Sequence, residues 1–195
     1  MNSAQDFLRS RRSIRRFKSD PIPDSVIKSI LTTATYAPSA HNLQPWRFAI
    51  VKNTDARKKL AITLTTKMRV DMQTEGADET EIESRVKRSI HRIDEAPVLI
   101  LLCRDVTTIR VDSPEETIMN IQSTALAGMN ILLAAHAKSL GANWICWPLY
   151  ATKETQAVLE LPENWEPQAM LIIGIANEQP KEKELKPLSQ ISVYL

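Results

Sequence analysis

The sequence contains few glycines, and their positions exclude two common classes of nucleotide-binding site. Only four glycines occur in 195 residues: Gly76, Gly128, Gly141 and Gly174. Neither the G-x-G-x-x-G fingerprint of dinucleotide-binding folds nor the G-x-x-x-x-G-K-[S/T] phosphate loop can be formed with them. A phosphate-bearing ligand would therefore have to be bound by cationic side chains rather than by a glycine-rich backbone loop.

Cysteine and histidine are equally scarce. The two cysteines, Cys103 and Cys146, lie in apolar runs typical of strands, which predicts buried free thiols rather than a disulfide. No C-x-x-C motif occurs, and the three histidines are far apart in the sequence. We therefore expect no metal site.

Long apolar runs and a strong net charge are absent too. No stretch reaches the length of a membrane span, and the first residues lack the apolar core of a signal peptide. The net charge of +2 is too small to indicate a nucleic-acid-binding protein. Residues 1–195 are expected to form a single domain, and a cytoplasmic location is the default expectation.

Apolar periodicity and capping residues predict helices that alternate with strands. Helices are expected at residues 3–12, from Asp24 or Ser25 to 34, and at 54–72, 78–93, 114–140 and 153–159. Strands are expected at 46–51, 96–103, 143–148 and 169–175. Gly141 is expected to end the 114–140 helix, which Ser113 and Pro114 begin. This alternation is typical of an α+β or α/β protein with a central sheet flanked by helices.

Two of the predicted helices have features that bear on a binding site. In the 54–72 helix a stripe of apolar residues indicates the core or a subunit interface: Leu60, Leu64, Met68 and Met72. The 78–93 helix is heavily charged and is expected to be a partly exposed cover. Its basic residues either bring positive charge to a pocket mouth, favouring anionic substrates, or form a solvated face: Arg85, Lys87, Arg88 and Arg92.

A cluster of arginines lies near the N-terminus, in the segment RRSIRRF. It comprises Arg11, Arg12, Arg15 and Arg16, with Ser13 among them. Guanidinium groups are always charged and bind phosphate bidentately, so this set suits a phosphate and the polar edge of a ring. The alternative is a solvated surface, which is our interpretation of Arg16.

A polar loop is predicted between Pro38 and Pro45, where an amphipathic helix leads into an apolar strand. The loop carries a hydroxyl, an imidazole and two amides, on Ser39, His41, Asn42 and Gln44. This hydrogen-bonding capacity is typical of a ligand loop. An ordinary helix-to-strand turn is the alternative.

Together, RRSIRRF and APSAHNLQPWRF resemble the opening of the FMN-dependent nitroreductase family in order and spacing. The resemblance continues through SLGANWICWP, LPENWEPQAMLIIGIA and the tail KPLSQ, and so covers nearly the whole chain. Within the family, the segment DMQTEG is similar to the branch that contains the C-terminal reductase domain of the coenzyme F420 ligase.

The resemblance implies both a fold and an assembly. It favours the α+β class: a three-layer sandwich whose central mixed sheet is flanked by helices. It also implies a homodimer in which the C-terminal arm of each subunit completes the partner's sheet. The flavin sites would then lie at the subunit interface.

The resemblance also implies the cofactor, FMN, and the residues that contact it. Arg11, Arg12, Ser13 and Arg15 would bind the phosphate and the pyrimidine side of the ring, and Ser39 and Asn42 would reach the flavin from the neighbouring subunit. Asp71 is a further expected contact, and Trp147 and Pro148 would line the ring. Lys186 is the nearest replacement for the family's tail arginine, with Lys183 as the second choice.

No catalytic side chain is predicted, since flavin N5 would carry the chemistry. The principal hypothesis is an FMN-dependent oxidoreductase that transfers hydride, by a ping-pong mechanism, from NADH or NADPH to a flat acceptor. The acceptor would be a small molecule such as a nitroaromatic, a quinone or a conjugated alkene. Two alternatives remain open: a reductase of a dehydro-F420 precursor in coenzyme F420 maturation, and a non-catalytic flavin carrier.

Overall fold

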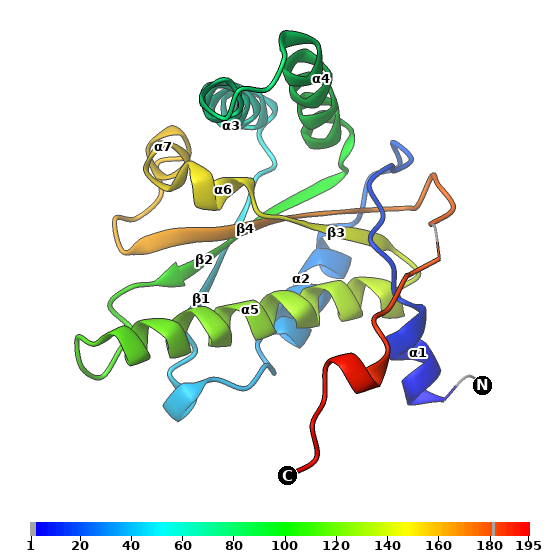
Figure 1. Cartoon of the computed structure of the whole chain (residues 1–195), viewed down its shortest axis with the longest axis vertical. Coiled ribbons are helices and arrows are strands. Elements are labelled where there is room, and N and C mark those ends of the chain that lie inside the picture. Colours follow the sequence, from blue (N-terminus) through cyan, green and yellow to red (C-terminus); the bar gives the residue numbers. More distant parts are fainter. Residues whose placement is uncertain (1–2, 181) are drawn as a thin grey trace.

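A four-stranded sheet separates two layers of helices in the computed structural model, which describes residues 3–180 and 182–195 (Figure 1). The strands are β1 (Trp46–Ile50), β2 (Val98–Asp105), β3 (Gly141–Ile145) and β4 (Trp165–Gly174), in the order β1-β2-β4-β3. All three strand pairs are antiparallel. The α+β class is confirmed, but the expected mixed sheet is wrong for these four strands. In the described residues, parallel pairing is limited to one bridge, Ser13 with Ala142.

The central strand β2 shows how the three layers are held together. All eight of its residues are buried, which explains the apolar run that predicted it. Alternate side chains point to opposite faces. Ile100 and Leu102 pack with one core cluster, and Leu99 and Leu101 pack with the other.

Each cluster joins the sheet to one helical layer (Figure 1). On one face lie α3 (Thr54–Thr74), α4 (Glu79–Glu95), α6 (Trp147–Tyr150) and α7 (Thr152–Val158). On the other lie α2 (Asp24–Ala34) and the long α5 (Pro114–Ala137), with α1 (Ala4–Ser10) beside the end of α5. Short 3-10 turns occur at Ala40–Asn42 and Leu188–Gln190. The predicted helices are therefore all present, although several boundaries differ.

The long helix α5 begins as predicted but ends earlier. Ser113 Oγ accepts a hydrogen bond from the Glu116 backbone N–H at 3.3 Å, and Pro114 occupies the first turn. The helix stops at Ala137, and Ser139, not Gly141, adopts the left-handed conformation, with φ of 57°. Gly141 instead opens β3, where a Cβ would lie 2.7 Å from the Ile14 side chain. This glycine is required for close packing, so its predicted role as a helix stop is wrong.

The expectation that no stretch reaches the length of a membrane span is wrong by length and composition, because this helix is long and apolar enough to cross a membrane. Half of its most apolar window is buried inside the structure. Among the described residues it is the one helix with this property. A core helix beneath a sheet has the same composition. The position of α5 against the sheet accounts for its apolar character.

The strand β3 is shifted toward the N-terminus relative to its prediction at 143–148. It starts at Gly141 and ends at Ile145, so Trp147 and Pro148 form the first turn of α6 instead. Cys103 is buried as expected, whereas Cys146 is exposed at the turn between β3 and α6. The prediction of a buried Cys146 is wrong because the strand ends before it.

The strand β4 is longer than predicted and begins at Trp165 rather than at 169. Two of its first four residues, Glu166 and Gln168, are polar, and the Glu166 charge is neutralised within the sheet. Glu166 accepts two hydrogen bonds from Arg104 of β2, at 2.7 and 3.0 Å, and the Gln168 amide donates to Glu166 at 2.8 Å. An apolar pattern could not reveal this extension, because it depends on pairing across strands.

Both N-terminal helices differ from what their sequence patterns indicate. Leu8 is an apolar residue of the predicted 3–12 helix, but it is exposed, and α1 has no buried residue. Pro23 occupies the N-cap position of α2, so neither Asp24 nor Ser25 is the N-cap, and no side chain caps this helix by a hydrogen bond. Burial of the α2 face by Ile27, Ile30 and Ala34 therefore holds this helix in place.

Candidate functional site

The arginine cluster lines a cavity of about 400 Å³ at one end of the sheet. Its lining is Arg11, Arg12, Ser13, Arg15, Glu178, Gln179, Pro180, Glu182 and Lys183. The chain reaches this point because Ser13 pairs with Ala142 at the start of β3, where Ile14 N–H donates to Ala142 O at 3.0 Å. The structure therefore brings together the four N-terminal residues predicted from RRSIRRF. Arg16 does not line the cavity and is exposed, as expected.

The guanidinium groups in this cavity form no ion pair with any residue that the structure describes. Arg12 donates instead to the carbonyl oxygens of Arg9 and Arg11, and Arg15 Nη1 lies 3.5 Å from Ser13 O. Charged donors bonded only to carbonyl groups retain their full positive charge. The cavity is therefore suited to an anion.

The positive field extends from this cavity toward α4. Burial lowers the pKa of Arg92, and the neighbouring charges of Arg15 and Arg88 lower it further, against a smaller opposing effect of Glu178. Like charges are therefore gathered at the junction of α4 and the N-terminal segment, where an anion would reduce their mutual repulsion.

The tail brings one of its lysines to this cavity. Lys183 lines the arginine cavity, whereas Lys186 lies outside its lining, and both lysines are exposed. Lysine binds phosphate as a point charge, so either residue could perform this role. Within a single chain, the second-choice residue is the one beside the arginines.

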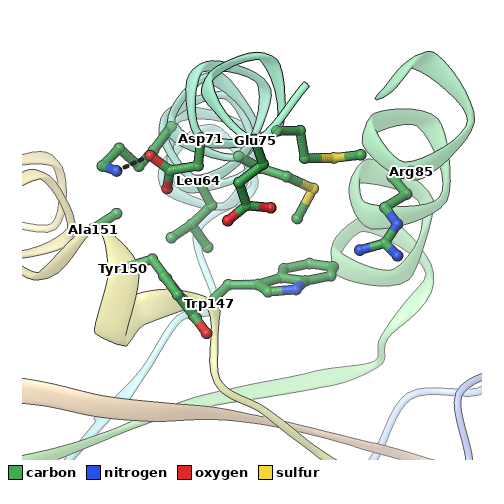
Figure 2. A pocket seen from close by; sticks show the side chains of 10 residues that line it. Leu64, Asp71, Glu75, Arg85, Trp147, Tyr150 and Ala151 are labelled. Carbon is green, nitrogen blue, oxygen red and sulfur yellow. Dashed lines mark hydrogen bonds and ion pairs between the residues drawn. The ribbon is translucent and has the colours of Figure 1, made fainter. Parts of the chain in front are cut away.

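A second cavity, of about 270 Å³, lies at the other end of β3. Figure 2 shows the Trp147 ring along its floor, with Glu75, the residue after α3, above it and Arg85 of α4 beside the ring. Asp71 lines this cavity but is already paired with Lys67 one helical turn away. Pro148 is buried and is not part of the cavity lining.

Sequence reasoning missed part of this cavity. Leu64, Met68 and Met72 belong to the stripe assigned to the core or an interface, yet all three line the cavity. Glu75 and Tyr150 were not identified either. The one available signal was the spacing of Asp71 and Glu75, which places two carboxylates on the same helix face. Arg85 alone of the four basic residues on α4 lines the cavity, and Glu81 pairs with it at 3.3 Å.

The two cavities lie at opposite ends of one strand. Ser13 docks at the first residues of β3, and Trp147 follows its last. Five residues of extended chain span roughly 16 Å. An elongated ligand with a phosphate at one end and a flat ring at the other could contact both cavities.

The polar loop has an unusual backbone. His41, Asn42 and Gln44 have φ values of 52°, 55° and 52°, which non-glycine residues seldom adopt. Ser39 Oγ accepts a hydrogen bond from the Gln44 backbone N–H at 3.1 Å, and Asn42 Oδ1 accepts one from the Gln44 amide at 3.1 Å. Strained backbone that is held by its own side chains is a feature of ligand-binding loops.

Within one chain, this loop does not meet the arginine cavity. Ala40 N–H donates to Ser123 Oγ in the first half of α5, at 3.2 Å. At the other end of α5, His136 lines a further cavity, of about 340 Å³, together with Arg11 and Arg12. Ser123 and His136 are thirteen positions apart on the helix, which corresponds to about 20 Å. Within one chain, the two halves of the predicted site therefore lie far apart along α5.

His136 is the main residue near the arginines that sequence reasoning missed. Its ring stacks on Phe7 with centroids 5.0 Å apart, and its Nε2 lies 2.8 Å from Ser10 Oγ. These contacts hold α1 against the end of α5 and so position Arg11, which follows α1 directly. No local pattern could have indicated them, because α1 and α5 are far apart in the sequence.

Comparison with known proteins relates the chain to flavin enzymes. A family model described as "Nitroreductase family" matches residues 8–175. A Bacillus subtilis protein with the provisional name NAD(P)H nitroreductase YfhC is 29% identical over 187 residues, which is 94% of this chain and 90% of that protein. The 5,6-dimethylbenzimidazole synthase of Rhodospirillum rubrum is 29% identical over 181 residues, which is 91% of this chain and 84% of that protein.

A solved structure supports the same relationship. The crystal structure of a BluB-like flavoprotein from Clostridium difficile superposes with a TM-score of 0.82 at 27% identity. The similarity covers 100% of both chains. The whole architecture, and not only the arginine segment, is therefore shared with that protein.

Proposed function

Because this chain belongs to the nitroreductase family and is, through that membership, an FMN-dependent NAD(P)H oxidoreductase, we propose that it transfers hydride to a flat, small-molecule acceptor. The transfer follows a ping-pong sequence in which the nicotinamide donor and the acceptor use the same pocket in turn. Nitroaromatics, quinones and conjugated alkenes are the proposed acceptor classes. A cytoplasmic location is part of this proposal.

The observation that carries the proposal is the arginine cavity. Its guanidinium groups have no acidic partner among the described residues, and no glycine-rich loop is available for a phosphate. Arg11, Arg12 and Arg15, with the Ser13 hydroxyl, have the charge and donors that the phosphate of FMN requires. Lys183 or Lys186 would add a further positive charge from the tail.

The Trp147 cavity fits the ring end of the same cofactor. Trp147 offers an apolar face, and Asp71, held by Lys67, keeps a fixed acceptor near it. Bound FMN supplies the redox chemistry by accepting hydride at N5 and passing it to the acceptor. The side chains of this cavity orient the flat donor or acceptor and limit the access of water.

The proposal includes a homodimer with shared sites. Ser39 and Asn42 lie about 20 Å along α5 from the arginine cavity, so they would contribute to the site of a partner subunit. Three apolar side chains of α5 support such an interface because each is at least 40% exposed: Ile118, Leu126 and Met129. Exposed apolar side chains on one helix face are a frequent mark of association.

The C-terminal tail also supports association. Val193 and Tyr194 are 76% and 91% exposed in the single chain. At the opposite edge of the sheet, β1 is unpaired on its outer side among the described residues. An apolar groove beside β1 contains Ile27, Leu31 and Phe48. We propose that the partner's tail covers this groove and completes the sheet there.

The test is an anaerobic titration of the FMN-loaded protein, followed by its absorption spectrum. Bleaching by NADH or NADPH, and recovery of colour with a nitroaromatic or quinone, is the expected result. Bleaching only by reduced F420, or turnover confined to a dehydro-F420 precursor, would favour the F420 alternative. Bound flavin that no donor bleaches would indicate the carrier, and absence of flavin binding would refute the proposal.

A further inference from the structure

A carboxylate of the chain itself lies within the arginine cavity. Glu178 Oε1 accepts hydrogen bonds from the backbone N–H groups of Arg15 and Arg16, the second at 3.3 Å. The arginine side chains do not pair with it, since no ion pair joins Glu178 to any described residue. Its negative charge is thus held by backbone donors, beside guanidinium groups that remain available.

Glu178 is fixed in this position by the pairing of two segments. The Lys18 N–H donates to Ile175 O at 2.9 Å, and the Asn177 N–H donates to Arg16 O at 3.0 Å. A bridge between Phe17 and Ala176 aligns the same segments antiparallel. This pairing ends one residue before Glu178 and so places its side chain beside the backbone of Arg15 and Arg16.

The position is electrostatically unusual. Two backbone N–H groups that point to one oxygen, as those of Arg15 and Arg16 do, can serve as donors to an anion. Here a carboxylate occupies those donors, and it brings a negative charge into a cavity whose arginines would attract an anion. A site that served only to bind phosphate tightly would have a neutral hydrogen-bond acceptor, not a carboxylate, on these two N–H groups.

We propose that Glu178 sets the affinity of the arginine cavity for a phosphomonoester, by opposing the phosphate charge while it positions the Arg15 backbone. The inference depends on the proposed phosphate site. Its consequence is that the phosphate-bearing cofactor is held less tightly than the arginines alone would hold it, and so can exchange. Glu178 is a positioning residue, since it acts through the backbone and the local field.

The test replaces the charge but keeps the hydrogen-bond acceptor. In Glu178→Gln, the amide oxygen can still accept from the Arg15 and Arg16 N–H groups, so the pairing is retained. Glu163→Gln is the matched control, because it changes the net charge equally but precedes β4 at its other end. Ten residues of β4 place it about 33 Å away.

Dissociation constants for FMN and riboflavin are measured with the full chain at low and high salt. Glu178→Gln is expected to bind FMN about threefold to tenfold more tightly than the unmodified protein at low salt, as expected for like charges about 3–6 Å apart that are screened as in bulk water. The gain should shrink at high salt because ions screen the interaction. Riboflavin, which lacks the phosphate, should bind both proteins equally, and Glu163→Gln should bind FMN as the unmodified protein does.

Inorganic phosphate is the second probe, read as an increase in melting temperature. A larger increase for Glu178→Gln would support the inference even if FMN bound neither protein, and would then separate it from the proposed function. Equal FMN affinities, a weaker Glu178→Gln, or an equal gain for riboflavin would overturn the inference while leaving flavin binding intact. No response of any protein to FMN or phosphate would overturn both.

Discussion

The replacement of Arg11 by alanine is the most direct test of how the cofactor is held. Arg11 follows α1 and lines two cavities, the arginine cavity and the cavity that contains His136. Its side chain is half-buried and has no acidic partner among the described residues. Loss of a charge-assisted hydrogen bond costs about 1.5–3 kcal/mol. The dissociation constant for FMN should therefore rise roughly 10- to 150-fold.

Two further substitutions calibrate this effect. Arg15→Ala should fall at the lower end of the same range, because the Arg15 side chain is exposed and solvent screens its charge. Arg16→Ala is the matched control. The substitution removes the same charge from the same segment, but Arg16 lines neither cavity. It should change FMN affinity by less than about threefold.

The assay is quenching of flavin fluorescence when the apoprotein is titrated into FMN, repeated with riboflavin. The effect of Arg11→Ala should be several times smaller for riboflavin, because the lost bond goes to the phosphate. Equal losses for all three arginine variants would refute the reasoning, since they would indicate a diffuse field and not specific contacts. Equal losses for FMN and riboflavin would place Arg11 elsewhere than at the phosphate.

Three other outcomes follow from the structure. Deletion of the residues after Pro187 should shift the protein toward monomer in light scattering, and an unchanged dimer would exclude the tail as part of the interface. Gly141→Ala should lower the free energy of unfolding by about 1–3 kcal/mol in urea, because the new Cβ would meet Ile14; unchanged stability would show that the two segments separate freely. Burial raises the pKa of Asp105, but hydrogen bonds from Thr107 and Asn164 and the charge of Arg47 outweigh it and lower the pKa to about 2. The stability that Asp105 contributes should thus be complete above about pH 4 and be lost as the pH falls toward 2, whereas Asp105→Asn should flatten this part of the stability curve; identical curves would contradict it.

Local sequence signals determined most of the secondary structure. Asn53 and Ser113 directly precede α3 and α5 and accept hydrogen bonds from their first turns. The apolar run that predicted β2 forms the most buried strand of the sheet. These features could be predicted because capping and burial on both faces depend on residues close together in the chain. The two motifs that carry the family resemblance are local in the same way.

Several features depend on contacts between distant residues. Ser139, not Gly141, has the left-handed conformation after α5. Gly141 lies in β3, where Ile14 approaches too closely for a side chain. The first residues of β4 were missed because Arg104 of another strand neutralises Glu166. A sequence pattern has no record of such pairings, so boundaries set by them could not be predicted.

The site divides along the same line. The types of residue that bind a phosphate were evident from RRSIRRF, since charge and hydrogen-bonding capacity belong to individual side chains. Tertiary structure alone decided that Lys183 and Glu178 join these arginines, and that the Ser39 loop lies about 20 Å from them along α5. The reason is physical: the sheet brings the start and end of the chain together, whereas a rigid helix holds the loop apart.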